Sequence, residues 1–127
     1  MKEYSTNQVR NVVLVGHGGS GKTSLVEAML HTSGATTRLG RVEDGSTVAD
    51  YEDEERNRKM SISTALVACE YEDHKINLLD TPGFTDFVGE VKSALKVADA
   101  AIVVIDAVAG VEVGTELVWD YCDEHNL

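Results

Sequence analysis

The chain has 127 residues, of which 43% are hydrophobic and 26% are charged, as in one ordinary globular domain. Its formal net charge of −11 argues against nucleic-acid binding through a broad basic surface, so we expect no direct DNA contact. No apolar run approaches the length of a membrane span, and the N-terminus lacks the apolar core of a signal peptide. We therefore expect a cytoplasmic protein without membrane contact.

The thiols and imidazoles of the chain show no metal-binding spacing. Cys69 and Cys122 are far apart, so buried reduced thiols in a reducing compartment are the favoured interpretation. No structural zinc is predicted, because the histidines are scattered along the chain at positions 17, 31, 74 and 125.

A phosphate-binding motif follows the first expected strand, residues 11–16. Residues 16–23 read Gly-His-Gly-Gly-Ser-Gly-Lys-Thr and match the pattern G-x-x-x-x-G-K-[ST]. Glycines let several backbone amides face one point, the start of the next helix adds partial positive charge, and Lys22 adds a full one. That helix is expected to end near Ser33, before Gly34. The pattern predicts a polyphosphate site, and a glycine-rich turn without a ligand is the alternative.

The middle of the chain contains an irregular polar segment followed by a predicted hairpin. Residues 35–60 have no core periodicity and include the acidic run 50–55, which is typical of a functional or disordered loop. Alternation over residues 62–69 then predicts a strand, a turn follows at 72–74, and residues 75–80 return as the second strand of a hairpin.

A second polar motif ends this hairpin. Asp80, Thr81, Pro82 and Gly83 follow the expected strand, at the edge where open α/β sheets bind ligands. Asp80 is expected to hold Mg²⁺ through a water and Thr23 through its hydroxyl, while the Gly83 amide faces the terminal phosphate. The alternative is an ordinary strand-to-helix turn that Asp80 caps.

The remaining elements alternate between helix and strand. We expect a helix over 86–97, a strand over 100–106 that is buried on both faces, and a helix over 113–125. Strands separated by helices predict an α/β fold with a mostly parallel sheet and one antiparallel hairpin. Four strands make a narrow sheet, so the chain is expected to be a fragment of a longer protein.

Four stretches in order resemble the N-terminal part of a translational GTPase, most nearly elongation factor G and its paralogues. They cover residues 16–25, 50–62, 80–91 and 103–112. The resemblance implies a P-loop NTPase three-layer fold truncated after about four strands. It also implies that residues 1–127 are a partial GTP-binding domain with a phosphate loop and two switches, and that the remainder and later domains are absent.

The resemblance also implies ligands and site residues. The ligands are GTP or GDP with Mg²⁺, and the partner of the full-length protein is the ribosome. Lys22 stabilises charge during GTP hydrolysis, residues 35–60 form the first switch, and Mg²⁺ is held by Thr23, Ser61 and Asp80. Ser61 replaces a family threonine, and the alternative for Ser61 is the polar face of a strand. Nucleotide contacts are implied for Gly16, His17, Gly18, Gly19, Ser20, Gly21, Lys22, Thr23, Ser24, Asp80 and Gly83.

Two positions depart from the family pattern. Phe84 stands where the family has a histidine that positions the attacking water, and Gly19 stands where an aspartate is common. A phenyl ring neither orients water through hydrogen bonds nor moves a proton. We therefore expect nucleotide binding to persist while hydrolysis is slow or uses another arrangement.

Several alternatives stay open. The chain lacks the Asn-Lys-x-Asp sequence that selects guanine in this family, so these residues leave GTP and ATP undecided. A diverged paralogue that acts in ribosome protection or release fits, as does a slowly hydrolysing binding switch. The fourth strand is expected to expose an unpaired edge, which predicts self-association or marginal stability of the fragment.

Overall fold

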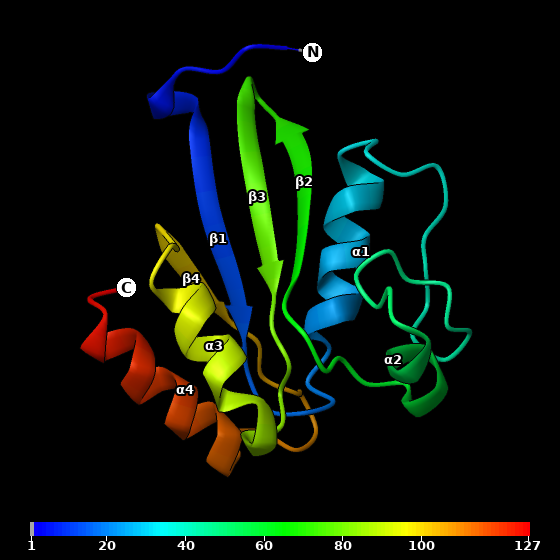
Figure 1. Cartoon of the computed structure of the whole chain (residues 1–127), viewed down its shortest axis with the longest axis vertical. Helices are drawn as coiled ribbons and strands as arrows, with labels where there is room; N and C mark the ends of the chain where they lie inside the picture. The colour runs from blue at the N-terminus through cyan, green and yellow to red at the C-terminus, as the bar shows by residue number, and fades with distance from the viewer. Residues whose placement is uncertain (1) are drawn as a thin grey trace.

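The computed structural model describes residues 2–127 and contains one four-stranded sheet with the strand order β2-β3-β1-β4. The strands are β1 (Val9–Val15), β2 (Ala65–Tyr71), β3 (His74–Asp80) and β4 (Ala100–Val103). Strand β1 runs parallel to both β3 and β4, while β2 is antiparallel to β3 (Figure 1). This arrangement confirms the predicted mostly parallel α/β sheet with one hairpin.

Helices cover both faces of the sheet and give three layers (Figure 1). Helix α1 lies on one face, whereas α3 and α4 pack together on the other. The short helix α2 lies near the N-terminal start of α1, and two 3₁₀ turns, η1 and η2, precede β1 and α3 (Figure 1). The bounds are α1 Lys22–Thr32, α2 Asp53–Arg58, α3 Val88–Leu95, α4 Val113–Glu124, η1 Thr6–Gln8 and η2 Thr85–Phe87.

Strand β1 supplies the centre of the core because its side chains alternate between the two covered faces. Val13 and Val15 pack with Val91, Leu95 and other apolar residues of α3 and α4. Leu14 packs with the α1 face in the second cluster, and all three β1 side chains are fully buried. Burial on both faces explains the continuous apolar run in the second half of this strand, residues 12–15.

The parallel pairing of β1 and β3 brings the two sequence motifs together. Leu14 is in register with Asp80, so the chain leaves both strands at the same edge of the sheet. The Thr81 hydroxyl donates a 2.6 Å hydrogen bond to the Leu14 carbonyl. This bond fixes the start of the loop that follows β3 against the end of β1, where the glycine-rich loop begins.

Strand β4 is shorter and more exposed than the sequence predicts. It ends at Val103 rather than at Asp106, because it pairs only with β1, which itself ends at Val15. No residue of β4 is buried, so the expectation of burial on both faces is wrong. The Asp106 carboxylate instead accepts hydrogen bonds from the Val108 and Ala109 amides in a turn.

Other boundaries also differ from those expected. Strand β2 begins at residue 65 rather than 62, and the helix expected over 86–97 is the turn η2 followed by α3. The 35–60 segment, expected to lack a core face, contains α2 and buries Ala49, Asp50 and Glu55. Its buried groups are mostly polar, so hydrophobic periodicity does not reveal them. Both cysteines are free and buried, as predicted. No helix within residues 2–127 is long and apolar enough to cross a membrane.

Candidate functional site

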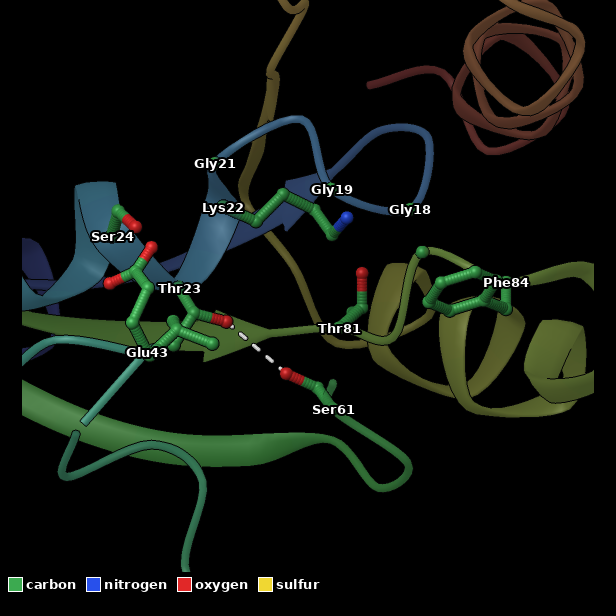
Figure 2. Close-up of a pocket in the computed structure, with 12 residues that line it drawn as sticks. Gly18, Gly19, Gly21, Lys22, Thr23, Ser24, Glu43, Ser61, Thr81 and Phe84 are labelled. Atoms are coloured by element: carbon green, nitrogen blue, oxygen red, sulfur yellow. Dashed lines mark hydrogen bonds between the residues drawn. The ribbon is translucent and has the colours of Figure 1, made fainter. Parts of the chain in front are cut away.

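Lys22 is the first residue of α1, and its side chain folds back along the glycine-rich loop (Figure 2). Its ammonium group donates to the carbonyls of Gly16 at 3.1 Å and His17 at 2.9 Å. The side chain is only 6% exposed, and this burial lowers the pKa of Lys22, against an opposing effect of the Asp80 charge. A buried ammonium group beside a glycine-rich loop is suited to binding an anion, because the anion's charge compensates for the water that the ammonium group has lost.

Four polar side chains form a chain of hydrogen bonds beside this loop. The Thr23 hydroxyl donates to the Asp80 Oδ2 atom at 2.7 Å, and the Ser61 hydroxyl donates to the Asp50 Oδ1 atom at 2.7 Å. The Thr23 and Ser61 hydroxyl oxygens lie 3.2 Å apart. Side chains from α1, β3, the 35–60 segment and the residue that follows it therefore meet at one point. Figure 2 shows the contact between Thr23 and Ser61.

Asp80 has an unusual environment for a carboxylate. Burial raises its pKa to about 6, against the opposing effects of the Thr23 hydrogen bond and the Lys22 charge. The carboxylates of Asp50 and Glu27 raise that pKa further. The second oxygen of Asp80, Oδ1, is buried and has no hydrogen-bond partner within residues 2–127. A buried, unpartnered carboxylate oxygen is a costly feature that a cation would relieve.

These oxygens fit a hard divalent cation. Mg²⁺ prefers oxygen donors, and here the donors are the Thr23 and Ser61 hydroxyls and the orphaned Asp80 oxygen. No group of three or more His, Cys, Asp or Glu side chains that would hold a metal alone is found within residues 2–127. The donor set is thus one that needs ligand oxygens to complete it, as is usual for Mg²⁺ with phosphates.

A cavity of about 170 Å³ lies between the glycine-rich loop and the 35–60 segment. Gly83 forms part of its wall, where a Cβ atom would collide with the Lys22 ammonium group and the backbone of Gly18. A residue without a side chain is therefore required at this position. The cavity is lined by Gly18, Gly19, Gly21, Lys22, Thr23, Ser24, Val42, Glu43, Ser61, Thr81, Gly83 and Phe84.

Phe84 lies at the side of the cavity opposite Ser24 and Glu43 (Figure 2). Its ring packs against Gly18, where a Cβ atom would come within 2.7 Å of the ring. The side chain is 42% exposed and also borders a small apolar cavity lined by Val88 and Leu117. Phe84 therefore gives the site an apolar wall at the position where the family resemblance has a histidine.

The remaining predicted residues surround the loop in different ways. The His17 ring points toward α4, where its Nδ1 atom accepts from the Gly114 amide and its Nε2 atom lies 3.6 Å from the Glu112 carboxylate. Gly16 and His17 contribute carbonyls to Lys22, and the Ser20 hydroxyl is buried.

The sequence interpretation missed several residues near the site. Val42 and Glu43 line the cavity from the 35–60 segment, and Asp50 holds the Ser61 hydroxyl. Glu27, on α1, is completely buried. A signal for Glu27 was present, because it follows Thr23 by four residues and so lies on the same side of the helix.

Comparisons with known proteins agree with this arrangement. The family model described as the elongation factor Tu GTP binding domain matches residues 7–127. The chain is 43% identical over its full length to elongation factor G 2 of Streptomyces coelicolor. It is 42% identical over its full length to the mitochondrial ribosome-releasing factor 2 of Scheffersomyces stipitis. It spans 18% and 15% of the lengths of these two relatives.

Solved structures show the same fold. A crystal structure of a protein from Thermus thermophilus is similar over 92% of this chain and 18% of that protein, with a TM-score of 0.89 and 47% identity. The elongation factor SelB of Methanococcus maripaludis, solved with the GTP analogue GppNHp, matches all of this chain and 21% of its own, with a TM-score of 0.71 and 22% identity, which supports the fold alone. The motifs, their geometry and the match over residues 7–127 agree, and the chain belongs to the family of the elongation factor Tu GTP binding domain.

Proposed function

We propose that this chain is the phosphate- and metal-binding part of a GTP-binding and GTP-hydrolysing domain in a ribosome-associated translation factor that resembles elongation factor G. The observation that carries the proposal is the meeting of Lys22, Thr23 and Ser61 at one cavity beside a glycine-rich loop, with Asp80 hydrogen-bonded to Thr23. Residues 1–127 are then a partial GTP-binding domain, with the first switch in residues 35–60 and the second beginning at Asp80.

Different residues of the site would bind the phosphates and the metal of a bound triphosphate. The backbone amides of residues 18–23 and the Lys22 ammonium group would hold the β- and γ-phosphate oxygens, and Thr23, Ser61 and Asp80 would hold Mg²⁺. When bound, Mg²⁺ neutralises charge on these oxygens. Water attacks the γ-phosphorus, the bond to the bridging oxygen breaks, and GDP, inorganic phosphate and one proton are the products. Phe84 excludes water from one side of this site but cannot orient the attacking molecule.

The relatives' names support work on the ribosome. One relative is called elongation factor G 2 and another ribosome-releasing factor 2. We propose guanine nucleotide and the ribosome as partners of the intact protein, with elongation as the first candidate step and release or protection as the second. The cytoplasm is the proposed compartment, although several relatives are named mitochondrial.

A slowly hydrolysing binding switch is the second candidate function. The supporting observation is the packing of the Phe84 ring against Gly18, which leaves an apolar surface where water would need a hydrogen-bond acceptor. In this case the bound triphosphate orders residues 35–60, and its slow hydrolysis releases them. Single-turnover hydrolysis on ribosomes separates the two functions.

A titration tests the proposal. A fluorescent GTP derivative is titrated into the wild-type protein with and without Mg²⁺, and ATP is added in competition. Lys22→Ala is expected to abolish binding, because it removes the buried cation. Lys96→Ala, which removes an exposed lysine at the end of α3, is the matched control and should leave affinity unchanged. Retained micromolar affinity in Lys22→Ala would refute the phosphate site.

A further inference from the structure

Glu27 is a completely buried carboxylate outside the phosphate site. It lies on α1 four residues after Thr23, and its side chain does not line the cavity. Its two oxygens accept hydrogen bonds from different points of the 35–60 segment. Oε1 accepts from the Val48 amide at 2.5 Å, and Oε2 accepts from the Gly40 amide at 3.2 Å. Charged acceptors give stronger hydrogen bonds than neutral ones, so two such bonds fix a loop firmly.

The packing around Gly40 shows how closely the segment approaches this carboxylate. Gly40 is buried, and a Cβ atom there would lie 2.5 Å from the Glu27 Oε2 atom and 2.7 Å from the Ser46 carbonyl oxygen. Thr47 and Ala49, on either side of Val48, are also buried. The segment is therefore seated on α1 through its backbone rather than through a large apolar side chain.

Hydrogen bonds connect the 35–60 segment to the proposed metal-binding residues. Val48 is two residues from Asp50, whose carboxylate also accepts from the Thr47 hydroxyl at 3.1 Å. Asp50 holds the Ser61 hydroxyl, and that hydroxyl lies 3.2 Å from the Thr23 hydroxyl. The path thus starts on α1 at Glu27 and returns to α1 at Thr23, one helical turn away.

We infer that Glu27 is a positioning residue that anchors the 35–60 segment to α1 and thereby holds Ser61 at the phosphate site. The inference rests on the proposed function, because the anchor matters for a ligand that Ser61 helps to hold. With the anchor in place, a triphosphate with its metal meets an ordered segment and loses less conformational freedom on binding. A diphosphate has no terminal phosphate near Ser61 and gains little from the anchor.

Limited proteolysis tests the anchor without nucleotide. Trypsin cleaves after arginine, and Arg38 and Arg41 are exposed beside Gly40. Glu27→Gln keeps the size of the side chain but loses an acceptor, because its amide group cannot accept from both backbone amides. Cleavage after Arg41, followed by mass spectrometry, should be roughly tenfold faster in this variant. Glu124→Gln, at an exposed position on α4, is the matched control and should behave as wild type.

Nucleotide selectivity tests the positioning role. In the presence of Mg²⁺, Glu27→Gln should bind a non-hydrolysable GTP analogue roughly tenfold more weakly than wild type, while its GDP affinity should stay within about twofold. A residue that merely stabilises the fold would weaken both nucleotides alike. Unchanged cleavage after Arg41, or an unchanged ratio of the two affinities, would overturn the inference.

A second variant keeps the test decisive if Glu27→Gln fails to fold. Gly40→Ala displaces the loop from the carboxylate without changing α1 and should give the same faster cleavage and the same selective loss of triphosphate affinity. Wild-type behaviour of Gly40→Ala would then overturn the inference. If wild-type protein bound neither nucleotide, the proposed function would fail, whereas the proteolysis result would still decide whether Glu27 anchors the loop.

Discussion

The ring of Phe84 packs against the backbone of Gly18, so an apolar side chain of the second motif closes one side of the phosphate loop (Figure 2). A histidine at position 84 would bring a hydrogen-bonding ring to the same wall. Phe84→His is therefore expected to raise ribosome-stimulated GTP turnover of the intact protein by at least about tenfold, since a positioned acid or base contributes roughly 10²–10⁴-fold. Single-turnover hydrolysis with saturating ribosomes measures the effect.

The control for this change is Phe84→Leu, which keeps an apolar wall and should leave turnover low. Nucleotide affinity should be similar in both variants, because neither change removes a phosphate-binding group. Turnover in Phe84→His equal to that of wild type would remove Phe84 as the cause of slow hydrolysis.

Ser61 is predicted to link the metal to the 35–60 segment through its hydroxyl. Ser61→Ala removes an oxygen 3.2 Å from the Thr23 hydroxyl and leaves the Asp50 Oδ1 atom without the donor it has in the wild type. We expect roughly tenfold weaker binding of a GTP analogue at limiting Mg²⁺, because a hydrogen-bonded group is lost beside a buried carboxylate. Ser61→Thr restores the hydroxyl and should bind as wild type. Equal Mg²⁺ dependence in the alanine variant and wild type would place Ser61 outside the metal site.

Asp80 is predicted to reduce the stability of the nucleotide-free protein. Its folded pKa of about 6 lies above the ordinary value of 3.8, so the folded state binds this proton more tightly than the unfolded chain. The free energy of unfolding therefore falls as the pH rises from 3.8 to 6 and stays lower above pH 6. Asp80→Asn removes this effect and should stabilise the nucleotide-free protein by about 2–3 kcal/mol at pH 7.5.

Urea unfolding at pH 7.5 and pH 4 measures this difference, which should shrink at the lower pH. The same variant should lose Mg²⁺-dependent nucleotide affinity, because it removes a carboxylate from the metal site. An Asp80→Asn protein that is less stable than wild type at pH 7.5 would contradict the role of burial in raising the pKa of Asp80.

The edge strand β4 is predicted to promote self-association of residues 1–127. It pairs with β1 on one side only, and none of its residues is buried. Unpaired backbone groups at a sheet edge pair readily with another chain. Light scattering over a range of protein concentrations should show a mass that increases with concentration. A monodisperse monomer with one cooperative thermal transition would argue against this prediction.

The glycine-rich loop and the Asp80 motif could be located from the sequence because both depend on local patterns. Glycines, a lysine and a strand before them define the loop, and parallel pairing of β1 with β3 then places Asp80 beside Thr23. The three-layer fold follows from the alternation of strands and helices in the same way.

The sequence did not predict how the 35–60 segment folds, because its stabilising contacts are polar. Glu27, Asp50 and Glu55 are buried carboxylates that accept hydrogen bonds from backbone amides and hydroxyls. In a sequence, such residues resemble a solvated surface, since acidic side chains are seldom buried. The length of β4 was also unpredictable, because it depends on where its partner strand ends.

The most direct measurement is a crystal structure of the protein with Mg²⁺ and a non-hydrolysable GTP analogue. We predict that the β- and γ-phosphates lie in the cavity against the amides of residues 18–23 and the Lys22 ammonium group, with the metal beside Thr23, Ser61 and Asp80. An analogue bound elsewhere, or a cavity that stays closed by its own backbone at saturating analogue, would contradict the central claim.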